Sequence, residues 1–316
     1  MNILICPSHN YIMPYGIMLE SLYANNKSED IHVYAIIDED VTEDDKMALE
    51  DVVKKHHAKQ IFYKFFTEEV FNTFPNLEST HINKTAYYRL FAATLLPKDV
   101  TKILYLDGDI IIMDSLKGLW DTNVDGIAVA GVMNQTQSYG YYNRLHYPSK
   151  LGYINSGVLL INLKYWRDYQ IENRFVDFIQ KYPDRIRWHD QDVINYVLQE
   201  YKRFLPLIYN VQSGFYQKPE YCEIDYWSME SEILNAQKHP IVLHFTGNEK
   251  PWFANSRHPR VKDFLTYKEN TLWDDVPLLK VRKTWKKKLR SHIRRLMEFM
   301  QILPHRVHIN KYIDNV

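Results

Sequence analysis

Short apolar runs alternate along the chain with longer segments in which apolar residues recur every three or four positions. Runs of the first kind predict β-strands, and segments of the second kind predict amphipathic helices. The strand-like runs lie at residues 2–6, 31–37, 60–63, 103–106, 126–132, 153–161 and 241–245. The helix-like segments lie at residues 12–25, 43–57, 84–95, 165–182 and 192–200.

This alternation of strands and helices predicts an α/β fold in which a mostly parallel sheet is sandwiched by helices. Ligands of such sheets bind beyond the carboxyl ends of the strands. The loops at residues 7–11, 107–109 and 246–252 each follow a predicted strand. Functional residues are therefore expected in these three loops.

The distribution of charge divides the chain into two parts. The 316 residues, of which 46% are hydrophobic, are sufficient for one large domain with a substantial core. Residues 280–306 contain ten Lys or Arg residues and one acidic residue, Glu298, although the formal net charge of the whole chain is zero. The preceding part is therefore correspondingly acidic. This predicts a catalytic or binding body at residues 1–279 and a basic tail at residues 280–316.

Apolar residues recur at spacings of three and four within the basic tail, which predicts an amphipathic helix. They are Trp285, Leu289, Ile293, Leu296, Met297 and Met300. Such a helix is typical of segments that lie on an anionic membrane surface, so residues 280–306 are expected to dock there. The same pattern also fits a charged terminal helix that packs on the body. Nucleic acid is not an expected partner, because nothing in the body supports it.

Cysteine usage and the first residues indicate a cytoplasmic protein. Cys6 and Cys222 have no spacing typical of zinc sites, and two isolated cysteines fit a reducing compartment. The segment MNILICPSHN lacks the features of a secretion signal. No run approaches the ~20 apolar residues of a membrane-spanning helix. With its tail, the protein is expected to lie peripherally on the inner face of the cytoplasmic membrane.

Three Asp-x-Asp triplets occur, at residues 38–40, 107–109 and 190–192. The first opens an acidic run before a helix, which indicates a solvated turn. The second follows an apolar run, and Gly108 would allow the backbone to approach a ligand closely. Asp107 and Asp109 point to opposite sides of an extended chain, so they reach one cation only if the chain bends at Gly108 or if one of them acts through water. A turn capped by two Asp side chains fits the pattern as well as a metal site does.

The chemistry of any metal site depends on a third loop. His244 ends the run PIVLHF, and it becomes a ligand only if its loop lies beside the Asp107–Asp109 loop; otherwise it is a structural residue. Two carboxylates and an imidazole favour Mn²⁺ or Mg²⁺ over zinc. Gly247 and Lys250 follow closely, and they supply the backbone amides and the cation of an anion site. A metal beside this loop would suit a diphosphate leaving group.

Six segments in order make the chain resemble the family 8 retaining glycosyltransferases, especially the bacterial lipopolysaccharide galactosyl- and glucosyltransferases. They are NILICPSHNY (2–11), HINKTAYYRL (81–90), KILYLDGDIII (102–112), YINSGVLLINL (153–163), HDQDVIN (189–195) and HFTGNEKPW (244–252). The resemblance implies a GT-A fold that binds a UDP-sugar and Mn²⁺, with Asp107, Asp109 and His244 as the metal ligands.

The resemblance also implies which residues bind the donor. Gly247 and Lys250 match positions that contact the diphosphate, and Asn10 and Tyr11 match the loop that holds uridine. Ser8 stands near the uracil position, where many relatives carry an acid. The residues implied around the sugar and its metal are Arg89, Gly108, Asn155, Ser156, Asp190 and Gln191. Asp190, Gln191 and Lys250 are the expected catalytic residues.

The implied reaction is transfer of a hexosyl group, galactose or glucose, from a UDP-sugar to a hydroxyl of a glycan or glycolipid, with retention of configuration. Retention requires front-face attack or a double displacement, for which Asp190 is the nearest matched acid; we favour front-face attack. Another metal-dependent nucleotide enzyme, such as a nucleotidyltransferase, is an alternative, but residues 6–16 are not the glycine-rich loop that it would need. A catalytically inactive membrane-surface binding protein is a second alternative.

Overall fold

The structure is a computed structural model of the chain. It describes residues 1–58, 60–66, 85–137, 139–219 and 225–280, together with Ile293, Leu296, Met297 and Met300. The predicted amphipathic tail therefore lies, apart from these four residues, outside the described part. No helix of the described part is both long and apolar enough to cross a membrane.

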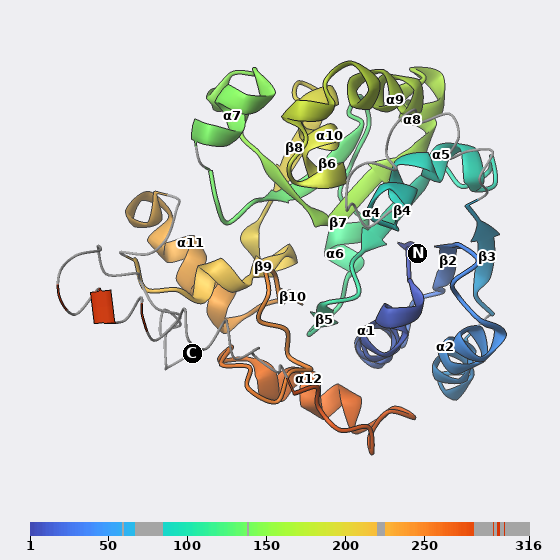
Figure 1. Ribbon diagram of the computed structural model, residues 1–316. Helices are drawn as coiled ribbons and strands as arrows, with labels where there is room; N and C mark the ends of the chain where they lie inside the picture. Colours follow the sequence, from blue (N-terminus) through green and yellow to red (C-terminus); the bar gives the residue numbers. More distant parts are fainter. Residues whose placement is uncertain are drawn as a thin grey trace.

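A seven-stranded sheet forms the centre of the molecule, with the strand order β3-β2-β1-β4-β7-β6-β8 (Figure 1). The strands are β1 (Asn2–Ile5), β2 (His32–Ile37), β3 (Phe62–Phe65), β4 (Lys102–Leu106), β6 (Val129–Met133), β7 (Ile154–Asn162) and β8 (Lys202–Leu205). Neighbouring strands are parallel except at β7, which is antiparallel to β4 and β6. The prediction of a mostly parallel sheet is confirmed.

A second, three-stranded sheet lies beyond the end of β4. Its order is β5 (Ile110–Ile112), β10 (Val242–His244) and β9 (Val211–Gln212). The run at residues 241–245 is a strand as predicted, but it belongs to this small sheet rather than to the large one. Strands β5, β8 and β9 were not predicted, because each is at most four residues long and β8 is a partly polar edge strand.

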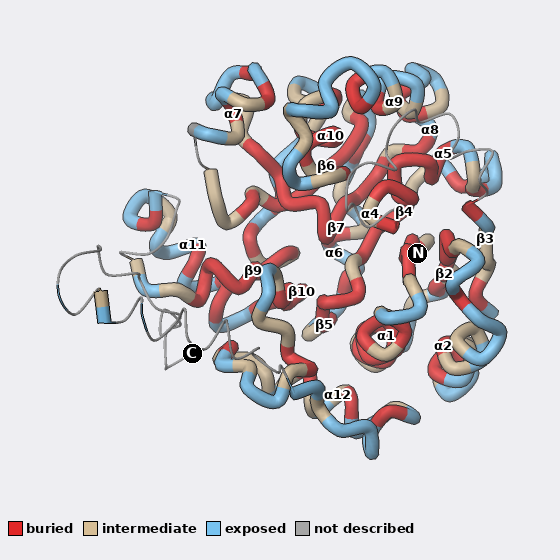
Figure 2. The backbone as a smooth tube through the Cα atoms, viewed as in Figure 1, coloured by how far each residue is buried: buried red, intermediate tan, exposed pale blue. Residues whose placement is uncertain are grey.

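Helices cover both faces of the large sheet, and alternate strand residues face two separate cores. Ile3 and Ile5 of β1 pack with residues of α1 and α2, whereas Leu4 packs with residues of α8, α9 and α10. Figure 2 shows that the central strands are buried, whereas many residues of the outer helices are exposed. The α-helices are α1 (Ile12–Asn25), α2 (Glu43–Lys55), α4 (Thr85–Tyr88), α5 (Ala92–Leu95), α6 (Lys117–Trp120), α7 (Tyr139–Leu145), α8 (Leu163–Asp168), α9 (Ile171–Lys181), α10 (His189–Val197), α11 (Tyr226–Lys238) and α12 (Val261–Lys268).

Short 3₁₀ helices also occur in the described part, and two predicted helices are interrupted. They are η1 (His9–Tyr11), η3 (Arg89–Phe91), η4 (Ser149–Leu151), η5 (Pro183–Arg185), η6 (Leu207–Tyr209) and η7 (Ser213–Tyr216). The helix predicted over residues 84–95 is divided by η3 into α4 and α5. The helix predicted over residues 165–182 is broken because Gln170 has a left-handed backbone (φ 49°) between α8 and α9. The helix predicted from residue 192 begins at His189, which places Asp190 in its first turn.

Candidate active site

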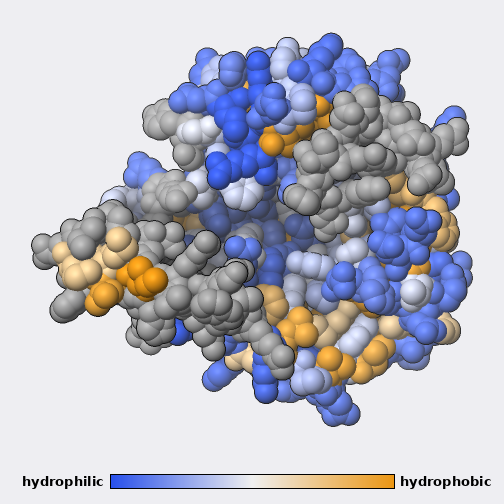
Figure 3. Space-filling model, viewed as in Figure 1, coloured by the Kyte–Doolittle hydropathy of each residue, from blue (hydrophilic) through white to orange (hydrophobic). Residues whose placement is uncertain are grey.

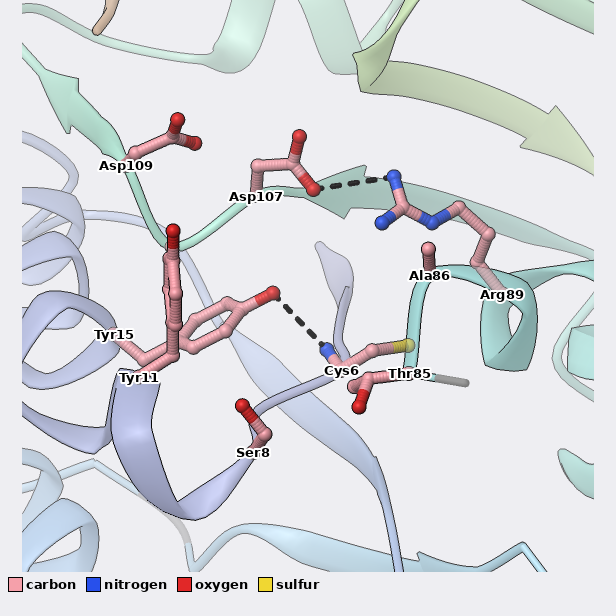
Figure 4. A pocket seen from close by; sticks show the side chains of 10 residues that line it. Cys6, Ser8, Tyr11, Tyr15, Thr85, Ala86, Arg89, Asp107 and Asp109 are labelled. Atoms are coloured by element: carbon pink, nitrogen blue, oxygen red, sulfur yellow. Dashed lines mark hydrogen bonds and ion pairs between the residues drawn. The ribbon is translucent and has the colours of Figure 1, made fainter. Parts of the chain in front are cut away.

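The Asp107–Asp109 loop joins the two sheets, because β4 ends at Leu106 and β5 begins at Ile110. The chain turns at Gly108, so both carboxylates lie on the same side of the loop, as the metal interpretation requires (Figure 4). A Cβ atom at Gly108 would lie 2.9 Å from the ring of Tyr15. The glycine therefore allows the backbone to pass over this aromatic ring, and it also lines the adjoining pocket.

Antiparallel pairing of β5 with β10 brings His244 to this loop. His244 is the register partner of Ile110, the residue after Asp109. Its Nε2 atom lies 3.2 Å from Oδ1 of Asp109 and 3.9 Å from Oδ2 of Asp107. One ligand atom from each of the three residues lies within 4.8 Å of the others. The structure thus assembles the three side chains that the sequence suggested as metal ligands.

The donor set of this cluster fits a hard divalent cation. Carboxylate oxygens with an optional imidazole are typical ligands of Mn²⁺ and Mg²⁺. Two of the three side chains, those of Asp109 and His244, are buried. Asp107 keeps a quarter of its side chain exposed, which leaves access to the cluster from the pocket.

Gly157 of β7 forms the floor of the cluster. A Cβ atom there would lie 2.2 Å from Cε1 of His244 and 2.7 Å from Oδ2 of Asp107. The backbone N–H of Asp107 also donates to the carbonyl of Gly157, at 2.9 Å. Because Gly157 has no side chain, the side chains of His244 and Asp107 can lie close together. Sequence reasoning did not single out Gly157, although it stands in the matched segment YINSGVLLINL.

Lys250 balances part of the negative charge of the cluster. Its Nζ atom forms an ion pair with Oδ2 of Asp109 and donates to the carbonyl of Phe245 at 2.8 Å. Burial alone would lower the pKa of Lys250, but the Asp109 carboxylate outweighs this effect and raises it. Burial alone would raise the pKa of Asp109, but Lys250 and then His244 lower it well below its usual range. Both side chains are therefore charged at neutral pH.

Arg89 connects the cluster with Asp190. Its Nη1 atom lies 3.1 Å from Oδ1 of Asp107 and 3.4 Å from Oδ2 of Asp190. The guanidinium also lies over the ring of Tyr105, 3.9 Å from its centroid. Tyr105 in turn donates from its hydroxyl to Oδ1 of Asp107 at 2.5 Å. Tyr105 was missed in the sequence because an apolar strand residue gives no sign of a polar contact at its tip.

Burial dominates the electrostatics of Asp190. It raises the pKa of this carboxyl from 3.8 to about 6; Arg89 opposes the rise, and Asp107 adds to it. Arg89 is itself buried. The structure therefore holds a weakly acidic carboxyl and a permanent cation beside each other.

Asn155, Ser156 and Gln191 lie next to each other behind Asp190. The Nδ2 atom of Asn155 and the backbone N–H of Ser156 each donate to Oε1 of Gln191, at 3.0 Å. Arg89 donates to the carbonyl of Ser156 at 3.0 Å. These residues come from β7 and α10, which pack together, so the matched segments at 153–163 and 189–195 converge.

A pocket of about 170 Å³ opens beside the cluster. Its lining residues are Cys6, Ser8, Tyr11, Tyr15, Thr85, Ala86, Arg89, Asp107, Gly108 and Asp109 (Figure 4). On the space-filling view, hydrophilic side chains surround the recess in the middle of this face (Figure 3). Among the other predicted donor residues, Asn10 is exposed in η1, and Gly247 has a left-handed backbone (φ 80°) in the loop after β10.

Comparison with known proteins identifies relatives of this chain. The model of the family described as "Glycosyl transferase family 8" matches residues 2–256. General stress protein A of Bacillus subtilis (strain 168) is 28% identical over 280 residues, which cover 87% of this chain and 96% of that protein. Lipopolysaccharide 1,2-glucosyltransferase of Escherichia coli (strain K12) is 28% identical over 296 residues, which cover 90% of this chain and 83% of that protein.

Solved structures support the expected fold. The crystal structure of galactosyltransferase LgtC in complex with donor and acceptor sugar analogues superposes with a TM-score of 0.73 and 23% identity, covering 87% of this chain and 99% of that one. This likeness confirms the α/β fold of the GT-A type. The nucleotidyltransferase alternative does not agree with these matches. Because the family match spans most of the chain, this protein belongs to glycosyl transferase family 8 and is a sugar-transferring enzyme.

Proposed function

We propose that this protein is a retaining hexosyltransferase that moves galactose or glucose from a UDP-sugar to a hydroxyl of a glycan or glycolipid. The observation that carries the proposal is the cluster of Asp107, Asp109 and His244 beside Lys250, at the wall of a pocket. Relatives named lipopolysaccharide 1,2-glucosyltransferase and lipopolysaccharide 1,3-galactosyltransferase support the choice of hexose and acceptor class.

The leaving diphosphate would be neutralised from two sides. Asp107, Asp109 and His244 would hold Mn²⁺ or Mg²⁺, and the bound cation would supply Lewis-acid stabilisation of the charge that grows on the departing group. Lys250 remains charged beside Asp109 and would pair with a phosphate oxygen. A Cβ atom built on Gly247 would have no described atom within 4 Å. The Gly247 backbone is therefore open to the diphosphate and would approach it.

The rest of the donor would lie along the pocket. Ser8, Asn10 and Tyr11 would contact uridine, and the Tyr11 ring would stack on the base; Ser8 and Tyr11 line the pocket. The sugar would meet Arg89 and the polar residues connected to it, namely Asn155, Ser156, Asp190 and Gln191. Sugar hydroxyls need a dense set of donors and acceptors, which amide, carboxylate and guanidinium groups provide together.

Retention of configuration would follow from attack on the face that the diphosphate leaves. The acceptor oxygen would bond to the anomeric carbon as the bond to the diphosphate oxygen breaks, and its proton would pass to that diphosphate oxygen. Asp190, with a pKa of about 6, is mostly ionised at pH 7 and would stabilise positive charge on the sugar. A double displacement through Asp190 is the alternative, and a sugar trapped on this residue would establish it.

The acceptor would be reached at a membrane surface on the cytoplasmic side. In this proposal residues 1–279 form the catalytic domain and residues 280–316 the docking tail. Ile293, Leu296 and Met300 are exposed by 49%, 58% and 50%, and they are three of the residues that the sequence assigns to the apolar face. Exposed apolar side chains in a segment rich in Lys and Arg support binding to anionic lipid.

Donor hydrolysis tests the proposal most simply. The full chain is incubated with UDP-glucose, UDP-galactose and the UDP-N-acetylhexosamines, with MnCl₂ or with EDTA, and UDP release and thermal stabilisation are measured. We expect one UDP-hexose to be hydrolysed with Mn²⁺ and none with EDTA. Absence of both hydrolysis and stabilisation for every UDP-sugar would instead support the catalytically inactive binding protein.

A further inference from the structure

A chain of buried amide side chains connects His244 with Gln191. The Nδ1 atom of His244 lies 2.9 Å from Oδ1 of Asn210. The Nδ2 atom of Asn210 donates to Oδ1 of Asn155 at 2.9 Å, and Nδ2 of Asn155 donates to Oε1 of Gln191 at 3.0 Å. Asn210 is fully buried. These four side chains therefore form one hydrogen-bonded path from the candidate metal cluster to the candidate sugar site.

Backbone groups fix the direction of every bond in this path. An Asn or Gln side chain has one donating and one accepting end, so each known end determines the other. The backbone N–H of Gly157 donates to Asn155 at 3.0 Å, and therefore the contacted atom is Oδ1. Asn210 must then present its Nδ2 to that oxygen and its Oδ1 to His244. Nδ1 of the imidazole therefore carries a proton, which it donates to Asn210.

The other end of the path is fixed in the same way. The backbone N–H of Ser156 donates to Gln191, which identifies the contacted atom as Oε1. Both hydrogens of the Asn155 amide are used, one on Gln191 and one on Oδ1 of Asn134 at 3.2 Å. Its oxygen accepts from Gly157 and from Asn210. Asn155 has no spare bonding capacity with which to turn over, so the path has a single arrangement.

This arrangement suits His244 as a metal ligand. With Nδ1 donating to Asn210, Nε2 is the ring nitrogen available to a cation, and it faces Asp109 and Asp107 at 3.2 and 3.9 Å. A ligand histidine commonly donates its other ring N–H to an oxygen that fixes its orientation. Asn210 is held in place because it precedes β9, which pairs with β10 so that Gln212 faces His244.

We propose that Asn210 is a positioning residue, which sets the tautomer and orientation of His244 for cation binding and couples this ligand to Gln191 through Asn155. This inference rests on the proposed cation site. If Asn210 has this role, its substitution weakens cation binding, whereas a residue that only stabilises the fold would change stability alone. The two effects are separable because another buried asparagine, Asn26, makes its bonds to Leu22 and Leu116 outside the cluster.

Mn²⁺ binding by the full chain, measured from the EPR signal of the free ion, compares Asn210→Ala with Asn26→Ala. We expect Asn210→Ala to weaken the Kd about 10- to 100-fold, while Asn26→Ala lowers the melting temperature and leaves the Kd unchanged. Equal Mn²⁺ affinity in Asn210→Ala and wild type, or equal weakening in both variants, would overturn the inference. Failure of the wild type itself to bind Mn²⁺ would instead refute the proposed function.

Asn210→Asp separates the two halves of the role. An aspartate still accepts from Nδ1 of His244, but its second oxygen faces the accepting Oδ1 of Asn155, so the link to Gln191 is lost. We expect near wild-type Mn²⁺ affinity with a reduced kcat for donor hydrolysis; affinity as weak as that of Asn210→Ala would contradict the tautomer role. Nitrogen-15 NMR of the wild-type ring needs no variant: a proton on Nε2 rather than Nδ1 would also overturn it.

Discussion

His244 lies directly across from Ile110 in the antiparallel pair of β10 and β5. Because Ile110 follows Asp109, this pairing brings the imidazole to within 3.2 Å of a carboxylate that is far away in the sequence. Lys250 reaches the same carboxylate from the loop that follows β10. The small sheet is therefore the element that assembles the candidate active site.

Gly157→Ala should disrupt the cluster of Asp107, Asp109 and His244. The added Cβ would lie 2.2 Å from Cε1 of His244 and 2.7 Å from Oδ2 of Asp107, so the imidazole must move. We expect Mn²⁺ affinity to fall about 10-fold or more and the free energy of unfolding to fall by about 1–3 kcal/mol. Isothermal titration with Mn²⁺ and urea unfolding measure the two effects. Gly131→Ala, which meets the side chains of Ile154 and Leu159 at 3.1 and 3.2 Å, is the control that should lose stability alone.

Lys250→Met should make the protein more dependent on a bound cation. Removing the lysine leaves the buried carboxylate of Asp109 without its ion-pair partner, which costs about 3–5 kcal/mol for a buried pair. We therefore expect a lower melting temperature in EDTA and a larger rise on addition of Mn²⁺ than in wild type. Donor turnover should fall even at saturating Mn²⁺. An identical Mn²⁺-induced rise in both proteins would show that Lys250 and the cation do not share a site.

Asp190→Asn should change the pH dependence of stability. Burial raises the pKa of Asp190 from 3.8 to about 6, so the folded state binds this proton more tightly than the unfolded state. The resulting stability is complete below about pH 4 and is lost as the pH rises through 6, by about 3 kcal/mol in total. Asparagine cannot ionise, and the variant should gain this amount relative to wild type between pH 4 and 7. If the free energy of unfolding, measured with urea, changed with pH in the same way in both proteins, the raised pKa of Asp190 would be contradicted.

Deletion of residues 280–316 should release the protein from vesicles that contain anionic lipid and leave UDP-sugar hydrolysis intact. We expect this because the deleted segment contains the basic residues that would be attracted to anionic lipid, together with the exposed Ile293, Leu296 and Met300. Co-sedimentation with anionic and with neutral vesicles measures the binding. Equal binding by the truncated and full chains would assign the membrane contact elsewhere or remove it.

The sequence predicted the large elements of the fold because their periodicity is local. Alternation of apolar runs predicted the large sheet, and the helix predicted over residues 43–57 is α2, whose start is fixed by a capping box of Thr42 and Asp45. Breaks inside apolar segments were missed, since the left-handed Gln170 between α8 and α9 leaves the helical spacing of apolar residues intact.

The candidate site was only partly predictable, because its assembly depends on non-local pairing. Asp107 and Asp109 stand together in the sequence, but His244 joins them through the pairing of β10 with β5, a three-residue strand that was not predicted. Gly157 and Asn210 act by leaving space and by orienting another side chain. Such roles become visible only when the neighbours of a residue in space are known.

Mn²⁺ affinity of Asp109→Asn, compared with Asp40→Asn, tests the central claim most directly. Asp109 is buried in the cluster, whereas Asp40 belongs to another Asp-x-Asp triplet and is exposed in a turn. The account predicts that wild type and Asp40→Asn bind Mn²⁺ alike, and that Asp109→Asn binds at least about 100-fold more weakly and loses metal-dependent UDP-sugar hydrolysis. Wild-type affinity and turnover in Asp109→Asn would contradict it.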